Sequence, residues 1–149
     1  MEKQPTSRMC FVCGRDNPVG LHLNFEFDGE RVWTRFTPAE CYQGYPGILH
    51  GGITSTILDE VLGRTAIAHE LWMVTARMEV HYRAPIPTGQ PLTAMGEIVE
   101  VKRRVMHARG EIRLADGTLA AEALGTFVQA PVAMRAGWEE EQAYWRVPD

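Results

Sequence analysis

Residues 49–68 read LHGGITSTILDEVLGRTAIA, and this stretch decides the fold. Apolar residues recur at helical spacing from Gly51 to about Ala68 and form one broad stripe, made by Ile53, Ile57, Leu58, Val61, Leu62 and Ala68. The opposite face is small and weakly polar, with Ser55, Thr56, Gly63 and Ala66 around a single carboxylate, Asp59. Because a solvated helix face normally holds more long charged side chains, we expect a partner chain or a ligand to approach this face closely.

Strand patterns flank the helix on both sides. Before the helix, residues 21–27 alternate between apolar and polar, which predicts a strand. Asp28-Gly29 predicts a tight hairpin that leads into a second strand at residues 31–36. Residues 37–47 are predicted to form a loop. After it, the pattern predicts four strands, over residues 74–82, 92–101, 105–114 and 118–128, with turns near 85–89, 102–103 and 116–117. Hairpin links make the sheet mostly antiparallel. We therefore expect an α+β protein with about six strands and one long helix, in the order ββ-α-ββββ.

Length and composition limit the possible classes of protein. A chain of 149 residues predicts one domain over residues 1–149, with an N-terminal loop at 1–20 and a peripheral tail at 130–149. Fifteen basic and 19 acidic residues give a net charge of −4, which argues against a nucleic-acid binder. No stretch approaches the roughly 18 apolar residues of a membrane span, and the N-terminus lacks the apolar region of a secretory signal. We therefore expect a cytoplasmic protein.

The start of the predicted helix is the best candidate for chemistry. The first backbone N–H groups of a helix have no partner within it and lie at the positive end of its dipole, so they suit an anion or a developing oxyanion. Gly51 and Gly52 would let another group approach this backbone. Asp59 lies eight residues after Gly51, about 12 Å along the axis. If the two residues act together, two antiparallel copies of the helix must share the site. The alternative is a simple turn at His50 and a solvated or paired Asp59.

The same stretch resembles a known family. The run GYPGILHGG at 44–52, followed by Thr54, Leu58 and Asp59, resembles the hotdog-fold acyl-CoA thioesterases of the phenylacetate-degradation (PaaI) type, in which a sheet wraps one central helix. The resemblance extends from about Cys10 to Val128. It implies an acyl-CoA thioesterase that needs no cofactor and acts as a homodimer, with a dimer of dimers as a further possibility.

The resemblance also implies roles for single residues. The backbone amide of Gly51 would polarise the thioester carbonyl, and Asp59 of the other subunit would act as nucleophile or as general base for water. Thr75, from the same chain as the carboxylate, would orient that water, and His50 would have a supporting role. Gly44 stands where some relatives have an asparagine. The adjacent Gln43 is the candidate to replace it in substrate binding, beside Gly52.

Several alternatives remain open. Glu60 rivals Asp59 for the carboxylate role, although its position four residues before Arg64 suits an ion pair on the helix surface. A non-catalytic acyl-CoA-binding protein would have the same fold. A hotdog hydratase or dehydratase fits less well, because His50 and Asp59 lie nine residues apart on one helix.

Two clusters suggest ligands outside the helix. Cys10 and Cys13 form half of a zinc site, which His22 and Cys41 would have to complete; we predict no metal and two partly buried free thiols. A basic cluster is formed by Lys102, Arg103 and Arg104. It could hold the phosphates of CoA, or it could be only a solvated hairpin tip. Arg77 and Arg83 are other candidates for contacts with the phosphates. The four tryptophans, Trp33, Trp72, Trp138 and Trp145, are interpreted as packing residues.

Overall fold

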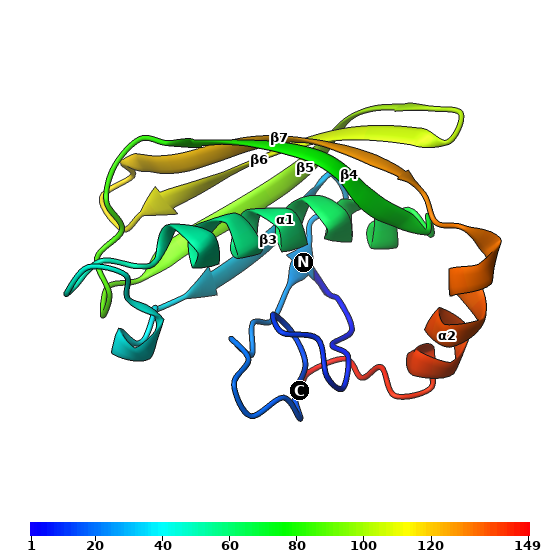
Figure 1. Cartoon of the computed structure of the whole chain (residues 1–149), viewed down its shortest axis with the longest axis horizontal. Helices are drawn as coiled ribbons and strands as arrows, with labels where there is room; N and C mark the ends of the chain where they lie inside the picture. Colours follow the sequence, from blue (N-terminus) through cyan, green and yellow to red (C-terminus); the bar gives the residue numbers. More distant parts are fainter.

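The computed structural model describes residues 1–149 as one curved antiparallel sheet that wraps a long helix. The elements are β1 (Glu2–Lys3), β2 (Glu26–Phe27), β3 (Arg31–Phe36), the short 3-10 helix η1 (Glu40–Tyr42), α1 (Gly51–Ala68), β4 (Met73–Tyr82), β5 (Leu92–Lys102), β6 (Val105–Leu114), β7 (Leu119–Gln129) and α2 (Val132–Gln142). The strands lie in the order β1-β2-β3-β5-β6-β7-β4. Figure 1 shows α1 on the concave face of the sheet and α2 apart from it, at one end. This is the expected α+β hotdog arrangement.

The apolar stripe of α1 packs against the sheet as predicted. Ile57, Leu58 and Leu62 are completely buried. Two glycines allow this close contact, because a Cβ atom at Gly96 would lie 2.4 Å from a carbonyl oxygen of α1 and one at Gly110 would lie 2.5 Å from the side chain of Leu62. The small residues of the sheet therefore set how deeply α1 is embedded, and this depth decides which α1 face stays accessible.

The predicted strand at 21–27 is wrong for most of its length. Only Glu26–Phe27 form a strand, β2, although burial alternates as the pattern predicted, with Leu23 and Phe25 inside. The backbone amides of Leu21 and Leu23 donate instead to the carbonyl oxygens of Phe11 and Val12. His22 has a φ of 54°, which breaks the extended conformation. The N-terminal loop thus replaces a neighbouring strand, and its first residues add a seventh strand, β1, to the six expected.

Within the peripheral tail expected at 130–149, residues Val132–Gln142 form the helix α2. Helix α2 has no buried residue. It is held by contacts that are distant in sequence: Trp138 stacks on Trp72 with ring centroids 5.0 Å apart, and Arg146 forms a backbone bridge with Thr6. These contacts tie both ends of the C-terminal segment to the body of the protein. Neither helix has the length and apolarity that a membrane crossing requires.

Strand β4 forms one edge of the sheet. It has ten residues and pairs on one side only, with β7. Its residues Thr75, Ala76 and Arg77 are exposed. A long exposed edge is unusual, because unpaired N–H and C=O groups invite another strand to pair.

Candidate active site

The start of α1 is capped by the side chain of His50. Its Nδ1 accepts the Gly52 N–H at 2.9 Å, and its carbonyl oxygen accepts the Ile53 N–H at 3.0 Å. In the neutral ring the proton therefore lies on Nε2. The Gly51 N–H donates to no acceptor in the protein, and the residue is exposed. One unpaired amide thus points outward at the positive end of the helix dipole.

The two glycines at the helix start have different reasons to be glycine. A Cβ atom at Gly52 would lie 3.0 Å from His50 Nδ1, so Gly52 makes room for the cap. A Cβ atom at Gly51 would make only ordinary contact, 3.5 Å from the ring of Tyr82. The internal packing therefore explains Gly52, which we expected to bind substrate, and leaves Gly51 free to serve an external group.

Tyr82 supports the helix start and was not anticipated from the sequence. Its hydroxyl donates to the carbonyl oxygen of Gly51 at 3.0 Å and accepts from the hydroxyl of Ser55 at 2.5 Å. The only signal in the sequence is a tyrosine at the end of a strand that follows the helix. The contact holds the peptide group beside the free amide in one orientation.

A cavity of about 810 Å³ surrounds the helix start. Gln43, Gly44, His50, Gly51 and Tyr82 are among the residues that line it. The Gln43 side-chain oxygen accepts the Gly47 N–H at 3.0 Å, so it closes the loop, while its side-chain nitrogen has no partner. Gln43 therefore lies where the sequence predicted, but only one half of its amide is available to a ligand.

Asp59 and Thr75 meet in the middle of α1. The Thr75 hydroxyl, from β4, donates to Asp59 Oδ1 at 2.6 Å, and Oδ2 accepts no side-chain hydrogen bond. Both residues line a second cavity, of about 870 Å³, whose walls are otherwise mostly apolar. The structure thus brings these two predicted residues together, with one carboxylate oxygen held and the other available.

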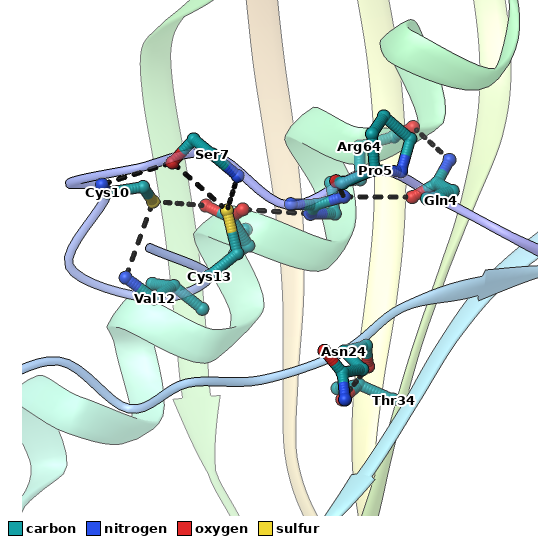
Figure 2. A network of polar contacts seen from close by, with 10 residues as sticks. Gln4, Pro5, Ser7, Cys10, Val12, Cys13, Asn24, Thr34 and Arg64 are labelled. Carbon is teal, nitrogen blue, oxygen red and sulfur yellow. Dashed lines mark hydrogen bonds and ion pairs between the residues drawn. The ribbon is translucent and has the colours of Figure 1, made fainter. Parts of the chain in front are cut away.

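Glu60, the alternative candidate for the carboxylate role, is engaged in an ion pair with Arg64. Its Oε1 accepts from Arg64 Nε at 2.9 Å, as the spacing predicted, but the arginine is buried rather than on the helix surface. Figure 2 shows how Arg64 also reaches the N-terminal segment, where it donates to the carbonyl oxygen of Pro5. Burial raises the pKa of Glu60, and the charge of Arg64 opposes this rise. Glu60 therefore belongs to a structural network.

The two cysteines of the N-terminal loop join that network. Cys10 Sγ lies 4.0 Å from Glu60 Oε2, and Cys13 Sγ accepts from the Ser7 N–H at 3.5 Å (Figure 2). Both thiols are free and partly or wholly buried, as predicted. The hydrogen bond from Cys10, the charge of Arg64 and the bonds from Ser7 lower the pKa of Cys13 to about 5, against the effect of burial.

The same cluster contains the only metal-like set of ligands. The possible ligand atoms of Cys10, Cys13 and Glu60 lie within 4.8 Å of one another. His22 and Cys41 do not complete this set: His22 contacts the carbonyl oxygen of Asn17, and Cys41 is exposed. The set provides three of the four ligands of a structural zinc site, and its carboxylate is already paired with the guanidinium of Arg64.

The basic residues expected to contact the CoA phosphates do not lie together at either cavity. Lys102, Arg103 and Arg104 are exposed at the β5–β6 turn and line neither of the two cavities. Arg83 lines the cavity at the helix start but is paired with Glu122 at 2.7 Å. Gly51 and Asp59 likewise line different cavities. Within one chain, the free amide and the carboxylate therefore face two separate cavities.

Comparison with known proteins identifies relatives. Residues 46–121 match the family model described as the thioesterase superfamily. The acyl-coenzyme A thioesterase THEM4 of Rattus norvegicus is 30% identical over 131 residues, which cover 86% of this chain and 56% of the rat protein. THEM4 of Xenopus laevis is 30% identical over 100 residues, 66% of this chain and 45% of the frog protein. The chain thus spans about half the length of these curated relatives.

Solved structures show the same fold. Protein RHA08564, described as a thioesterase superfamily protein, aligns with a TM-score of 0.77 and 33% identity, over 81% of this chain and 63% of that chain. A hypothetical thioesterase from Streptococcus pneumoniae TIGR4, solved with coenzyme A, has a TM-score of 0.67 and 24% identity, over 72% and 86% of the two chains. The PaaI protein of E. coli has a TM-score of 0.69 and 16% identity, over 73% and 84%.

Proposed function

Because the chain belongs to the thioesterase superfamily, we propose that it hydrolyses an acyl-CoA thioester to a carboxylic acid and free CoA. The observation that most supports this is the hydrogen bond of 2.6 Å between Thr75 and Asp59 at the wall of a largely apolar cavity. It provides a carboxylate with one oxygen held and one oxygen free. The unpaired Gly51 amide, on the same helix, provides the complementary donor for an oxyanion.

The proposed reaction uses these two groups on opposite sides of one carbonyl. The thioester oxygen accepts the Gly51 N–H, and the negative charge that develops on it is stabilised by this donor and the helix dipole. Asp59 removes a proton from water, whose oxygen attacks the carbonyl carbon, and the C–S bond then breaks to release the CoA thiolate, which takes up a proton. In the alternative, Asp59 attacks first and water hydrolyses the resulting anhydride. Thr75 positions the carboxylate in both versions.

We propose that the two halves of the site, the Gly51 amide and the Asp59 carboxylate, come from two subunits. Gly51 and Asp59 are separated by about 12 Å along α1 and line different cavities. A two-fold axis would place Asp59 of one chain opposite Gly51 of the other. The exposed edge of β4, next to Thr75, supports such a dimer, because pairing two β4 strands would satisfy its free backbone groups. A further pairing of dimers is compatible with this arrangement.

The other candidate functions have less support. His50, which a hydratase would need as a catalytic base, has its Nδ1 engaged in capping α1. A non-catalytic acyl-CoA-binding protein would not need the Thr75–Asp59 pair. For the CoA phosphates, we keep Lys102, Arg103 and Arg104 as proposed contacts, because none of the three forms an ion pair.

The test is the release of free thiol from a panel of acyl-CoA esters. We expect the wild-type protein to release CoA and the Asp59→Asn variant to lose a factor of about 10²–10⁴ in kcat, the range for a lost acid–base group. Glu100→Gln, an exposed carboxylate on β5, is the matched control and should keep its activity. Equal turnover by wild type and Asp59→Asn would refute the assignment, and binding of acyl-CoA without hydrolysis would favour the non-catalytic alternative.

A further inference from the structure

We propose that the cavity beside Asp59 binds the acyl group and selects a neutral, apolar acyl chain of about ten carbons, with Gly63 and Trp138 as specificity-determining residues. This inference rests on the proposed function. The cavity lies between α1, the beginning of β4, the N-terminal loop and α2. Its volume of about 870 Å³ is within the range of small-molecule sites and far exceeds the needs of an acetyl group.

The walls of the cavity favour a neutral chain. Apolar side chains predominate, among them Ile67, Leu71, Trp72, Phe127, Trp138 and Trp145. The only arginine in the lining, Arg64, is already bound to Glu60 and to the carbonyl oxygen of Pro5, so no free cation is available for a second carboxylate. The lining also contains Asp59 and Glu70, which form no ion pair. An acyl group that ends in a carboxylate would therefore be repelled.

The length of the cavity follows from the residues of α1 that line it. They extend from Asp59, where hydrolysis is proposed, to Ile67 near the end of the helix. Eight residues correspond to about 12 Å along the axis. An extended chain advances by about 1.2 Å per bond, so about ten carbons would fill this distance.

Gly63 forms the side of the cavity next to Asp59. It lies within α1, where a glycine costs about 1 kcal/mol relative to alanine. The fold does not require it, because a Cβ atom there would lie 3.7 Å from the nearest atom, in the ring of Phe127, an ordinary contact. Any larger side chain would project into the cavity, four residues from the carboxylate. We infer that Gly63 keeps the path of the acyl chain open.

Trp138 closes the far side of the cavity. It is on α2, a helix with no buried residue, and stacks on Trp72 at a centroid distance of 5.0 Å. Both rings line the cavity. This explains why an otherwise exposed helix is placed here, and it gives the two tryptophans, interpreted from sequence as packing residues, a role in limiting the acyl chain.

The test measures binding of non-hydrolysable S-alkyl-CoA thioethers (ethyl, hexyl, decyl and hexadecyl) by calorimetry, beside hydrolysis of the matching acyl-CoA esters. We expect affinity for the wild type to rise by about fourfold per methylene up to decyl and then to stop rising. Gly63→Leu should weaken decyl binding at least tenfold and leave ethyl unchanged. Trp138→Ala should weaken decyl binding and let affinity continue to rise from decyl to hexadecyl. Met134→Ala, an exposed position on α2, is the control.

The outcomes separate this inference from the proposed function. Hydrolysis that does not depend on chain length, with Gly63→Leu and Trp138→Ala like the wild type, would overturn the acyl pocket and leave the thioesterase intact. Length-dependent thioether binding without hydrolysis of any ester would support the pocket and overturn the enzyme. Gly63→Ala, which stabilises a helix, replaces Gly63→Leu if the latter does not fold. A preference for an acyl chain with a terminal carboxylate would also contradict the inference.

Discussion

The start of α1, at residues 50–55, and its middle, at residues 59–64, belong to one helix and one small-residue face but are built in different ways. The start is exposed and is held by a cap and by Tyr82, which leave the Gly51 amide without a partner. The middle faces a cavity that residues of α2 and the N-terminal loop also line, and its carboxylate is held by Thr75 from β4. In the proposed mechanism, the start supplies a hydrogen-bond donor and the middle supplies a base. The difference teaches that the local geometry is complete in each region, and that the proposed site combines the two regions through a second chain.

The strongest test of this comparison removes the donor without disturbing the helix. Proline is tolerated at the first helical position, and His50, with φ −58° and ψ 133°, has a conformation allowed before proline. We expect Gly51→Pro to lower kcat by about 10²–10³, the effect of losing one oxyanion donor. Gly51→Ala keeps the N–H and should lose less. Unchanged kcat in Gly51→Pro, measured by thiol release, would show that the helix start takes no part.

The shared site can be tested with the same variant. Mixed and reassembled Gly51→Pro and Asp59→Asn chains would form dimers in which one site has both wild-type groups. Activity should therefore return on mixing, although each variant alone retains only a small fraction of the wild-type activity. A lack of recovery, with exchange of subunits demonstrated by mass, would contradict the two-chain site.

The second prediction concerns the stability of the middle region. Replacing Arg64 by methionine leaves the mostly buried Glu60 carboxylate without its cation, and breaking a buried pair in this way costs about 3 kcal/mol of unfolding free energy. Arg35→Met, at an exposed position without an ion pair, should change stability by less than about 0.5 kcal/mol. Denaturant unfolding measures both. Equal stabilities would mean that the network does not hold the N-terminal loop on α1.

The third prediction sharpens the role of Thr75. A hydrogen bond to a charged group contributes about 1.5–3 kcal/mol, so Thr75→Val should lower kcat by about 10- to 100-fold with little change in KM. Thr75→Ser keeps the hydroxyl and should restore most of the activity. If serine and valine behave alike, the hydroxyl has no positioning role and β4 contributes only packing.

The smallest expected effect distinguishes Glu60 from Asp59 by pH. Burial raises the pKa of Glu60 in the folded protein, so its protonated form is favoured on folding. Its contribution to stability is therefore complete below the unfolded pKa and is lost as the pH rises through the folded value. As the pH increases, the unfolding free energy of the wild type should therefore fall relative to that of Glu60→Gln. A shift in the opposite direction would show that the charge of Arg64 dominates.

The N-terminal and C-terminal segments show where sequence patterns fail. Residues 21–27 alternate correctly between buried and exposed, yet the loop around Phe11 replaces the strand partner. Helix α2, which was not predicted from the sequence, has no buried residue. Tyr82 reaches the helix start only because β4 runs back along α1. All three depend on contacts between residues that are distant in the chain.

The sequence alone determined the central helix, most of the strands around it and the candidates Gly51 and Asp59, because helical periodicity, strand alternation and an unpaired helix start are local properties. Thr75 became a candidate only through the resemblance to the PaaI-type thioesterases. Only the tertiary structure decided that Thr75 holds Asp59, that Glu60 is bound to Arg64, and that α2 covers a cavity. The physical reason is that side-chain burial and pairing depend on which segments pack together. Spacing along the chain predicts which residues share a face, and packing decides what that face contacts.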